Sequence, residues 1–437
     1  MSCAIRITLA AAAVAAVAAP TPWRLTREGA QLLLGGKPFA AIGLNVVDLL
    51  WVRQGADCCH QRNNTRALED AAARGFPFVR FAASPYFPGG AEPEPGQWSQ
   101  SLRDWRDEPE RYWRDGMDRI VALARRLGIR LVPDLLWNAF AFADLCSEPL
   151  SALFNGSDTC TRRAARDFVT QAALRYASSD EILFWEISNE NNALVDGWFA
   201  NATTACDPLR GTPSHRSDAD NFDTAQMIAT HAWLAELVRA ADPGRLVNSG
   251  NSLPRPSAEH WRRTPRTAVA HHHIDSRRDN HSEFVRNLID TSASMDFASA
   301  HAGGGDSSDD RPFGPNMTTS DPTWLLELAR ATAANHSLPF YLGEFAITVT
   351  ASDGGLSGAS PPPSRSYTFA EAVVDWVIRT ACKSGGSVGM AGVLASVWVF
   401  EYKPQHSTLS VVPGRDDQLL AKLEEANKIL RTCMHSH

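Results

Sequence analysis

Two glutamates stand at the ends of apolar, strand-like runs, and together they could form a catalytic carboxyl pair. Glu190 ends the run Ile-Leu-Phe-Trp-Glu-Ile-Ser-Asn-Glu, and Glu344 lies in the run Phe-Tyr-Leu-Gly-Glu-Phe. Parallel strands of a barrel direct their carboxyl ends to one face of the fold. Two carboxyls about 5–5.5 Å apart on such a face can hydrolyse a glycoside in two steps, with retention of configuration.

The segment around Glu190 also predicts a protonation state and a local geometry. Apolar neighbours and a nearby carboxylate raise the pKa of a carboxyl group, which suits a proton donor, so a raised pKa is expected for Glu190. A glutamate that only caps a helix or fixes a loop is the alternative. Strict strand alternation would direct Asn189 away from the side of Glu190, so a bulge or sharp turn is expected if both line one site. Glu186 is expected to be a deeper, hydrogen-bonded barrel residue.

Other side chains have types that suit the binding of a sugar. Arg80 ends an apolar run and is predicted to point into the site rather than to the surface. Trp398 suits stacking on the apolar face of a sugar ring, with a place in the core as the alternative. His301 is predicted to be a neutral hydrogen-bonding residue beside the substrate. Lesser candidates for stacking are Trp51, Trp137 and Trp198.

Three adjacent histidines, His271, His272 and His273, raise the question of a metal site. They cannot all face one ion from a regular strand, and no carboxylate or cysteine stands nearby at a helical ligand spacing. We therefore expect a loop that lines a cleft. No metal ion and no cofactor are expected, because two carboxylates suffice for the chemistry.

The elements that must position these residues alternate along the chain in the pattern of parallel βα units. Apolar runs predict eight strands, at Phe39–Asn45, Phe78–Ala83, Arg130–Trp137, Ile182–Asn189, Leu246–Asn251, Met295–His301, Phe340–Ala346 and Val393–Glu401. Helical periodicity predicts Thr65–Arg74, Pro109–Leu127, Thr161–Ala177, Phe222–Ala241, His281–Asp290, Thr323–Asn335, Phe369–Lys383 and Asp417–Arg431. Eight such units predict an α/β fold, a (β/α)8 TIM barrel.

The chain is longer than the fold requires, and the surplus gathers after strands. Long loops on that face would build the walls of a substrate cleft. Residues 20–38 are predicted to form an N-terminal hairpin or lid over the bottom of the barrel. We expect residues 19–437 to form a single domain, because no linker divides them.

The N-terminus favours export from the cell. Residues 1–18 are interpreted as a signal peptide, because the apolar stretch from Ile7 to Ala19 is too short to span a bilayer and ends in small residues. A short helix or membrane anchor is the alternative. Some disulfides are expected among the mature cysteines, with at least one thiol left over: Cys58, Cys59, Cys146, Cys160, Cys206, Cys382 and Cys433. Glycosylation motifs begin at Asn63, Asn155, Asn201, Asn280, Asn316 and Asn335.

Composition narrows the class of partner. The 437 residues are 44% hydrophobic and 21% charged, with a net charge of -7, which is typical of a globular enzyme. Such a chain has no general basic field for nucleic acid. No later stretch has the apolar length of a membrane span. We expect a secreted, extracellular monomer.

The order of the strand-end residues resembles glycoside hydrolase family 5 and its clan, the cellulase and β-mannanase group. The resemblance covers nearly the whole mature chain. It implies that Glu190 is the acid/base, Glu344 the nucleophile, Asn189 a partner for the sugar 2-hydroxyl and Arg80 the cation that keeps Glu344 ionised. Gly343, Phe345, His301 and Trp398 complete the pattern.

Three positions depart from the family pattern. Asn191 follows the acid/base where the family usually has proline, and Gly303 stands where a tyrosine normally touches the nucleophile. Tyr341, Tyr367 or Tyr402 would have to replace that tyrosine. The third predicted strand ends in Leu-Trp-Asn138 without a histidine, which resembles β-mannanases more than cellulases and makes Asn138 a candidate substrate-binding residue.

The sequence thus predicts a retaining glycoside hydrolase that cleaves a β-linked polysaccharide, with endo-β-1,4-mannan hydrolysis ahead of β-glucan hydrolysis. Two alternatives remain open. An exo-acting enzyme on glycolipid or short glycosides would have a closed pocket instead of an open groove. A barrel that binds carbohydrate without cleaving it is the other.

Overall fold

The structure is a computed structural model of the chain. It describes residues 24–47, 49–50, 59–84, 97–197, 217–264, 275–302, 321–350, 364–382, 393–397 and 411–435. The predicted signal peptide and the three adjacent histidines lie outside these residues.

Eight parallel strands form the central sheet, in the order β8-β7-β6-β5-β4-β13-β10-β9. Each predicted strand is present, and most are a few residues shorter than expected. They are β4 (Ala41–Asn45), β5 (Phe78–Ala82), β6 (Arg130–Asp134), β7 (Trp185–Glu186), β8 (Val247–Asn248), β9 (Ala298–Ala302), β10 (Phe340–Phe345) and β13 (Val393–Val397).

Contacts between β8 and the chain that leads into β9 bring the two ends of the sheet together. The backbone N–H of Asp296 donates to the carbonyl of Val247 (2.9 Å), and the Asp296 carboxylate accepts the Val247 N–H (2.8 Å). Further along, the hydroxyls of Ser249 and Ser299 lie 3.2 Å apart. The sheet is therefore closed into the predicted (β/α)8 barrel.

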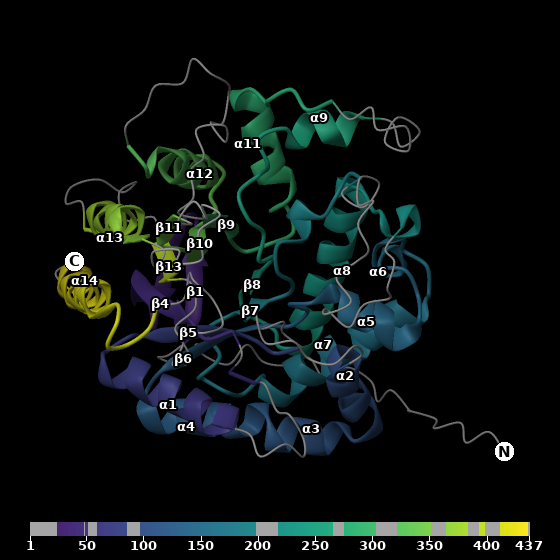
Figure 1. Cartoon of the computed structure of the whole chain (residues 1–437), viewed down its shortest axis with the longest axis horizontal. Coiled ribbons are helices and arrows are strands. Elements are labelled where there is room, and N and C mark those ends of the chain that lie inside the picture. The colour runs from purple at the N-terminus through teal and green to yellow at the C-terminus, as the bar shows by residue number, and fades with distance from the viewer. Residues whose placement is uncertain are drawn as a thin grey trace, which may run out of the picture.

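Each barrel strand is followed by a helix that packs on the outside, as Figure 1 shows around the central strands. Every predicted helix is present, and the one at His281–Asp290 has the predicted bounds. The helices are α1 (Cys59–Ala73), α4 (Met117–Leu127), α7 (Cys160–Tyr176), α8 (Thr224–Ala241), α11 (His281–Asp290), α12 (Trp324–Asn335), α13 (Thr368–Ala381) and α14 (Asp417–His435).

The second predicted helix is wrong in one respect, because it is two helices. The chain leaves the helical conformation at Gly116 (φ −103°, ψ −100°), which separates α3 (Pro109–Asp115) from α4. A Cβ atom at Gly116 would lie 2.9 Å from both the Leu50 side chain and the Tyr112 carbonyl. A residue with a side chain would not fit this break without movement of its neighbours.

The long segments after strands contain structure that the sequence analysis treated as loop. These additions lie between the barrel strands and their outer helices. They are α2 (Gln97–Asp107), α5 (Ala139–Cys146), α6 (Ser151–Phe154), η1 (Asn191–Ala193), η3 (Asp218–Asp220), α9 (Ala258–Arg263) and the antiparallel pair β11 (Thr348–Thr350) and β12 (Ser364–Ser366).

The N-terminal segment forms a small antiparallel sheet, which confirms the predicted hairpin. Its strands are β1 (Leu25–Glu28), β2 (Gln31–Leu34) and β3 (Lys37–Pro38). Leu25 and Leu32 are buried in one apolar cluster with barrel residues such as Phe184, Phe297 and Tyr341. The hairpin therefore closes the lower end of the barrel, opposite the strand ends that carry the glutamates.

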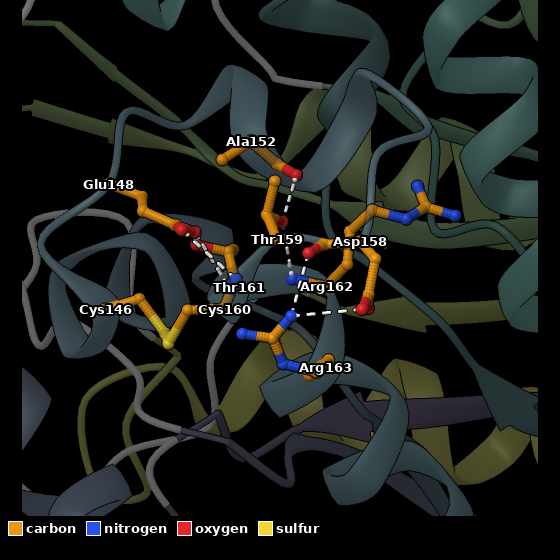
Figure 2. Close-up of a disulfide and its surroundings, with 9 residues drawn as sticks. All are labelled: Cys146, Glu148, Ala152, Asp158, Thr159, Cys160, Thr161, Arg162 and Arg163. Carbon is orange, nitrogen blue, oxygen red and sulfur yellow. Dashed lines mark hydrogen bonds and ion pairs between the residues drawn. A yellow bond between two sulfur atoms is a disulfide. The ribbon is translucent and has the colours of Figure 1, made fainter.

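Two disulfides confirm that some cysteines pair. Cys146 at the end of α5 is bonded to Cys160 at the start of α7, and Cys382 after α13 is bonded to Cys433 in α14. Figure 2 shows the first of these beside Glu148. The side chains of Cys58, Cys59 and Cys206 lie outside the described residues. Among the helices in the described ranges, none has the length and apolar composition to cross a bilayer.

Candidate active site

Glu190 occupies a sharp turn directly beyond β7. Its backbone is left-handed (φ 52°, ψ 29°), and its N–H donates to the carbonyl of Gly250 at 2.8 Å. A residue other than glycine rarely adopts this conformation. The turn interrupts strand alternation, as predicted, so that Asn189 and Glu190 both face the centre of the barrel.

Glu344 lies in β10, and His301 of the neighbouring β9 stands between the two glutamates. His301 Nδ1 is 3.1 Å from Glu190 Oε1 and 3.7 Å from Glu344 Oε2. Ligand-type atoms of the three residues all lie within 4.8 Å of one another. Because carboxylates accept and do not donate hydrogen bonds, Nδ1 must carry the proton of the His301 ring.

Gly343 makes room for this imidazole. A Cβ atom at position 343 would lie 2.6 Å from His301 Nε2, which is closer than side chains approach one another. The ring that contacts both glutamates therefore fills the space beside Gly343.

Arg80 is fully buried in the middle of β5 and lies beneath the glutamates. Its Nη1 donates to Glu344 Oε1 (2.6 Å) and to Asn45 Oδ1 (3.0 Å), and its Nη2 donates to Asn189 Oδ1 (2.8 Å). Its Nε donates to Glu186. The prediction that Arg80 points into the barrel is therefore correct.

Two more buried carboxyls surround the same guanidinium. Glu186 of β7 and Asp134 of β6 are both without solvent exposure, and Asp134 lies 3.4 Å from Arg80 Nη2. Burial, together with the nearby charge of Glu186, raises the pKa of Asp134 well above its usual range. Glu186, which accepts from Arg80, is the deep hydrogen-bonded residue that was predicted.

The pKa values of the two glutamates correct one expectation. Burial acts to raise the pKa of Glu190, but the hydrogen bond and charge of His301, aided by Arg80, lower it overall. Burial raises the pKa of Glu344 despite the attraction of His301 and Arg80. The prediction of a raised pKa for Glu190 is thus wrong, because His301 stabilises the Glu190 carboxylate.

The structure describes some of the other residues that were predicted to contact the sugar, but not all of them. Asn138 begins α5 just beyond β6, and its backbone carbonyl accepts a bond from Ala141 at 3.0 Å. Its neighbour Trp137 is the aromatic residue of this segment in contact with the site, with its ring 4.4 Å from the Arg80 guanidinium carbon. Trp51 and Trp398 lie outside the described residues, so their roles stay predictions.

The missing tyrosine is partly accounted for. Tyr341 is buried in the lower barrel cluster, and Tyr367 donates to Asp416 at 2.6 Å rather than to the nucleophile candidate. Tyr402 lies outside the described residues. His301 Nδ1 lies 3.7 Å from Glu344 Oε2, on the nucleophile candidate that the family pattern would place beside a tyrosine.

Sequence reasoning missed Asn45 and Asp134. Asn45 accepts from Arg80 and donates to the Gly343 carbonyl at 3.0 Å, so it links β4, β5 and β10. Asn45 is a polar residue that ends a predicted barrel strand, and Asp134 is a charged residue within another, which is the signal that could have identified them.

Two groups in the described residues have a spacing that could hold a metal ion. The first is Glu190, His301 and Glu344 themselves, and the second is His260, Asp279 and Glu283 near α9 and α11. In the second group the Asp279 carboxylate already accepts the N–H groups of Glu259 and His260, and Glu283 caps α11. These contacts give its carboxylates a structural role.

The barrel is similar in fold to solved structures of glycoside hydrolase family 5 enzymes and mannanases. The family 5 mannosidase of Rhizomucor miehei superposes with a TM-score of 0.60 at 13% identity, covering 96% of this chain and 100% of that one. The endo-1,4-beta-mannanase of the same organism gives 0.56 at 14% identity, covering 94% and 99%. The endo-beta-1,4-mannanase of Thermotoga petrophila gives 0.53 at 15% identity, covering 91% and 78%. The predicted resemblance is confirmed at the level of the fold.

Sequence comparison is less extensive. No family model matches the chain. An Arabidopsis thaliana protein with the provisional name mannan endo-1,4-beta-mannosidase 4 is 23% identical over 215 residues, which cover 44% of this chain. Those residues are 49% of the relative, so the match spans about half of its length.

Proposed function

We propose that this protein is a retaining glycoside hydrolase of the family 5 type that cleaves β-1,4-linked mannan, with Glu190 as acid/base and Glu344 as nucleophile. The observation that carries the proposal is the pair of glutamates, one directly beyond β7 and one in β10, which lie on either side of His301 with one oxygen of each within 4.8 Å of the other. So close an approach supports a retaining pair, with carboxyls about 5–5.5 Å apart, over an inverting pair at roughly 6.5–9.5 Å.

The sugar is inferred from the proteins that this chain is similar to. The Arabidopsis relative and the Rhizomucor and Thermotoga structures are named for mannan or mannoside hydrolysis. A variant of the Rhizomucor mannosidase is described in complex with mannosyl-fructose. These names favour a mannose-containing oligosaccharide or polysaccharide as the substrate.

The geometry suggests which nucleophile oxygen acts. Glu344 Oε1 is engaged by Arg80, whereas Oε2 faces His301 and the Glu190 carboxylate. In the first step Oε2 attacks the anomeric carbon while Glu190 gives its proton to the leaving oxygen. In the second step Glu190 takes a proton from water, which attacks the same carbon and releases Glu344.

The acid role requires a proton on Glu190 when substrate is bound. His301 opposes this, because its hydrogen bond and charge lower the pKa of Glu190. A sugar that enters between the carboxyls breaks that bond and buries Glu190 further. Both changes raise the pKa of Glu190, so that it takes up a proton from solvent before the first step.

Arg80 and Asn189 serve the nucleophile and the substrate. Arg80 donates to Glu344 and favours its ionised form, because a hydrogen bond from a cation stabilises a carboxylate. Asn189 Oδ1 accepts from Arg80, so its amide nitrogen faces the other way, toward the place of the sugar 2-hydroxyl. Trp398, Trp51, Asn138 and His301 are proposed as further contacts to the sugar.

The proposal includes the location and extent of the mature protein. Residues 1–18 would be removed as a signal peptide, and residues 19–437 would act as one secreted domain. The two disulfides support an oxidising compartment. Asn155, Asn280 and Asn335 are exposed, so their glycosylation motifs are accessible.

A screen for reducing sugar tests the proposal. The purified wild type is dialysed against EDTA, because the chemistry uses no metal ion, and is offered mannan, glucomannan, carboxymethyl-cellulose, laminarin and xylan. The proposal predicts release from mannan above the others and none by Glu344→Gln. Release of mannose alone from chain ends would indicate the exo-acting alternative. Binding of mannan without release would indicate the non-catalytic barrel.

A further inference from the structure

A buried imidazole lies beneath the turn that carries Asn189 and Glu190. His231 of α8 is 1% exposed, and its Nε2 is 3.2 Å from Ser188 Oγ and 3.3 Å from Asn191 Nδ2. Ser188 immediately precedes the pair and Asn191 immediately follows it. A single nitrogen atom therefore contacts both flanks of the turn.

This turn needs support from its surroundings. Glu190 is a non-glycine residue at a φ of 52°, a conformation that persists where neighbouring structure determines it. From the side of β8, the Gly250 carbonyl accepts the Glu190 N–H at 2.8 Å. Gly250 packs so closely that a Cβ atom there would lie 1.7 Å from the Ser188 carbonyl oxygen. His231 supports the turn from the opposite side, where α8 covers it.

The contacts hold the ring against the turn in either neutral tautomer. The Ser188 hydroxyl donates to the Ser249 carbonyl at 2.6 Å, so toward His231 it can only accept. A protonated Nε2 donates to Ser188, whereas an unprotonated Nε2 accepts from the Asn191 amide nitrogen. In the described residues, His231 Nδ1 has no hydrogen-bond partner. The polar contacts of this ring are therefore all made with the turn.

The protonation state of the His231 ring does not change near neutral pH. Burial lowers the pKa of His231 to about 4. The imidazole is therefore neutral at neutral pH, and its contacts with Ser188 and Asn191 do not depend on a charge. Such a contact can fix geometry without altering the electrostatics of the carboxyl pair.

We propose that His231 is a positioning residue that fixes the left-handed turn and thereby the direction of the Glu190 carboxyl. The inference rests on the proposed role of Glu190 as acid/base. Asn191, which stands where the family usually has a proline, supplies one of the two contacts. Without His231, the Glu190 carboxyl is no longer held in one position, whereas Glu344 keeps its hydrogen bond from Arg80.

The consequence is a selective loss of proton donation. Substrates with a poor leaving group need the acid, whereas an activated aryl glycoside leaves without a proton. His231→Phe keeps an aromatic ring but removes the nitrogen atom that contacts Ser188 and Asn191. His231→Gln places an amide near the position of Nε2 and should restore the contacts. Thr230→Val is the matched control, because Thr230 is a buried neighbour on α8 whose hydroxyl has no partner among the described residues.

The experiment measures kcat and KM for a series of aryl β-mannosides and mannobiosides with leaving groups of different pKa. For poor leaving groups, His231→Phe should lower kcat about 10- to 100-fold with KM nearly unchanged, and the dependence of rate on leaving-group pKa should steepen. The dinitrophenyl substrate should be cleaved at close to the wild-type rate. His231→Gln should recover most of the loss, and Thr230→Val should behave as wild type.

Equal losses for all leaving groups, or none, would overturn the positioning role. A crystal structure of His231→Phe gives a second, activity-independent readout. The inference fails if Glu190 keeps its positive φ and its contact with His301 in that variant. If instead Glu190→Ala shows no steepened dependence on the leaving group, the proposed acid/base role fails, and the crystal structure alone then decides whether His231 fixes the turn.

Discussion

At the scale of residues, the site is a set of four carboxyls arranged around one arginine and one histidine. Arg80 faces Glu186, Glu344 and Asp134, and His301 faces Glu190 and Glu344. Burial alone would lower the pKa of Arg80, but Glu186 and Glu344 raise it, so it stays charged. The carboxyl pair therefore lies beside the fixed charge of Arg80 and the hydrogen-bonding ring of His301, and substitutions at either residue should reveal its effect.

Replacement of Arg80 tests the role of its charge and its hydrogen bonds. Arg80→Lys keeps a positive charge but cannot hold Glu186, Glu344 and Asn189 at once. We expect kcat to fall about 100-fold, the cost of misplacing a reacting group by roughly 1 Å. Steady-state kinetics on folded protein measure this, with the exposed Arg125 changed to lysine as the control. A kcat near that of the wild type would remove Arg80 from the catalytic machinery.

Replacement of His301 tests its effect on the pKa values of the two glutamates through the pH dependence of the reaction. Its charge lowers the pKa of both Glu190 and Glu344, so its loss must raise both. The bell-shaped profile of kcat/KM should therefore move to higher pH on both limbs in His301→Ala. His336→Ala, at an exposed position on the far end of α12, is the control. A shift of either limb to lower pH contradicts the assigned electrostatics.

At the scale of elements, the strands and helices were predictable because each is a continuous pattern of apolar residues. The eight strand positions follow from runs such as the one before Glu190. β7 ends at Glu186 and is shorter than its apolar run. The Ile187 N–H makes the last bond to the neighbouring strand, at Asn248, and the chain then turns at Glu190. The break at Gly116 and the short helices after strands have no such pattern. Neither could be predicted.

Contacts between residues that are distant in the chain could not be predicted from the sequence either. The apolar residues next to Glu190 in the chain do favour a raised pKa for its carboxyl group. His301, 111 residues away, reverses it. The turn at Glu190 could be predicted because it depends only on local alternation, whereas its support by His231 depends on how α8 packs.

The start of α7 gives a prediction at this scale. Glu148 accepts the N–H groups of Cys160 and Thr161 at 3.1 and 2.8 Å, and Thr159 accepts the N–H of Arg162 at 3.1 Å (Figure 2). Loss of such a cap costs about 1 kcal/mol of unfolding free energy, and up to about 2. We expect Glu148→Ala to lose that amount in urea unfolding at pH 7.

The loss should also depend on pH. Burial acts to raise the pKa of Glu148, but the hydrogen bonds from Thr161 and Cys160 lower it overall. Its contribution is therefore present above the pKa of an unfolded glutamate and disappears as the pH falls through the folded pKa. The exposed Glu425→Ala is the control. A difference between Glu148→Ala and wild type that grows at low pH would contradict the cap.

At the scale of the whole molecule, the chain is closed at its lower end by the N-terminal sheet and tied at its C-terminal end by a disulfide. Cys382–Cys433 joins α13 to α14, which pack side by side (Figure 1). The other disulfide, Cys146–Cys160, joins the end of α5 to the start of α7. The two bonds close loops of very different length.

That difference predicts an order of stabilities. The separation of 51 residues in Cys382–Cys433 corresponds to about 4 kcal/mol of unfolding free energy, and the 14 residues of Cys146–Cys160 to about 3 kcal/mol. Replacing each pair by serines and measuring unfolding in urea should show the larger loss for the longer loop. The reverse order, or no loss on reduction of the wild type, would show that the bonds do not act through chain entropy.

The central claim is that Glu190 and Glu344 share one retaining mechanism with separate roles, and azide trapping tests it most directly. With an activated aryl β-mannoside, Glu190→Ala should form the glycosyl-enzyme and stall until azide attacks it, which gives the β-glycosyl azide. Glu344→Ala cannot form that intermediate, so azide should enter from the vacated face and give the α-glycosyl azide. Proton NMR of the products distinguishes the two. The reverse assignment of anomers, or inversion of configuration by the wild type, would contradict the account.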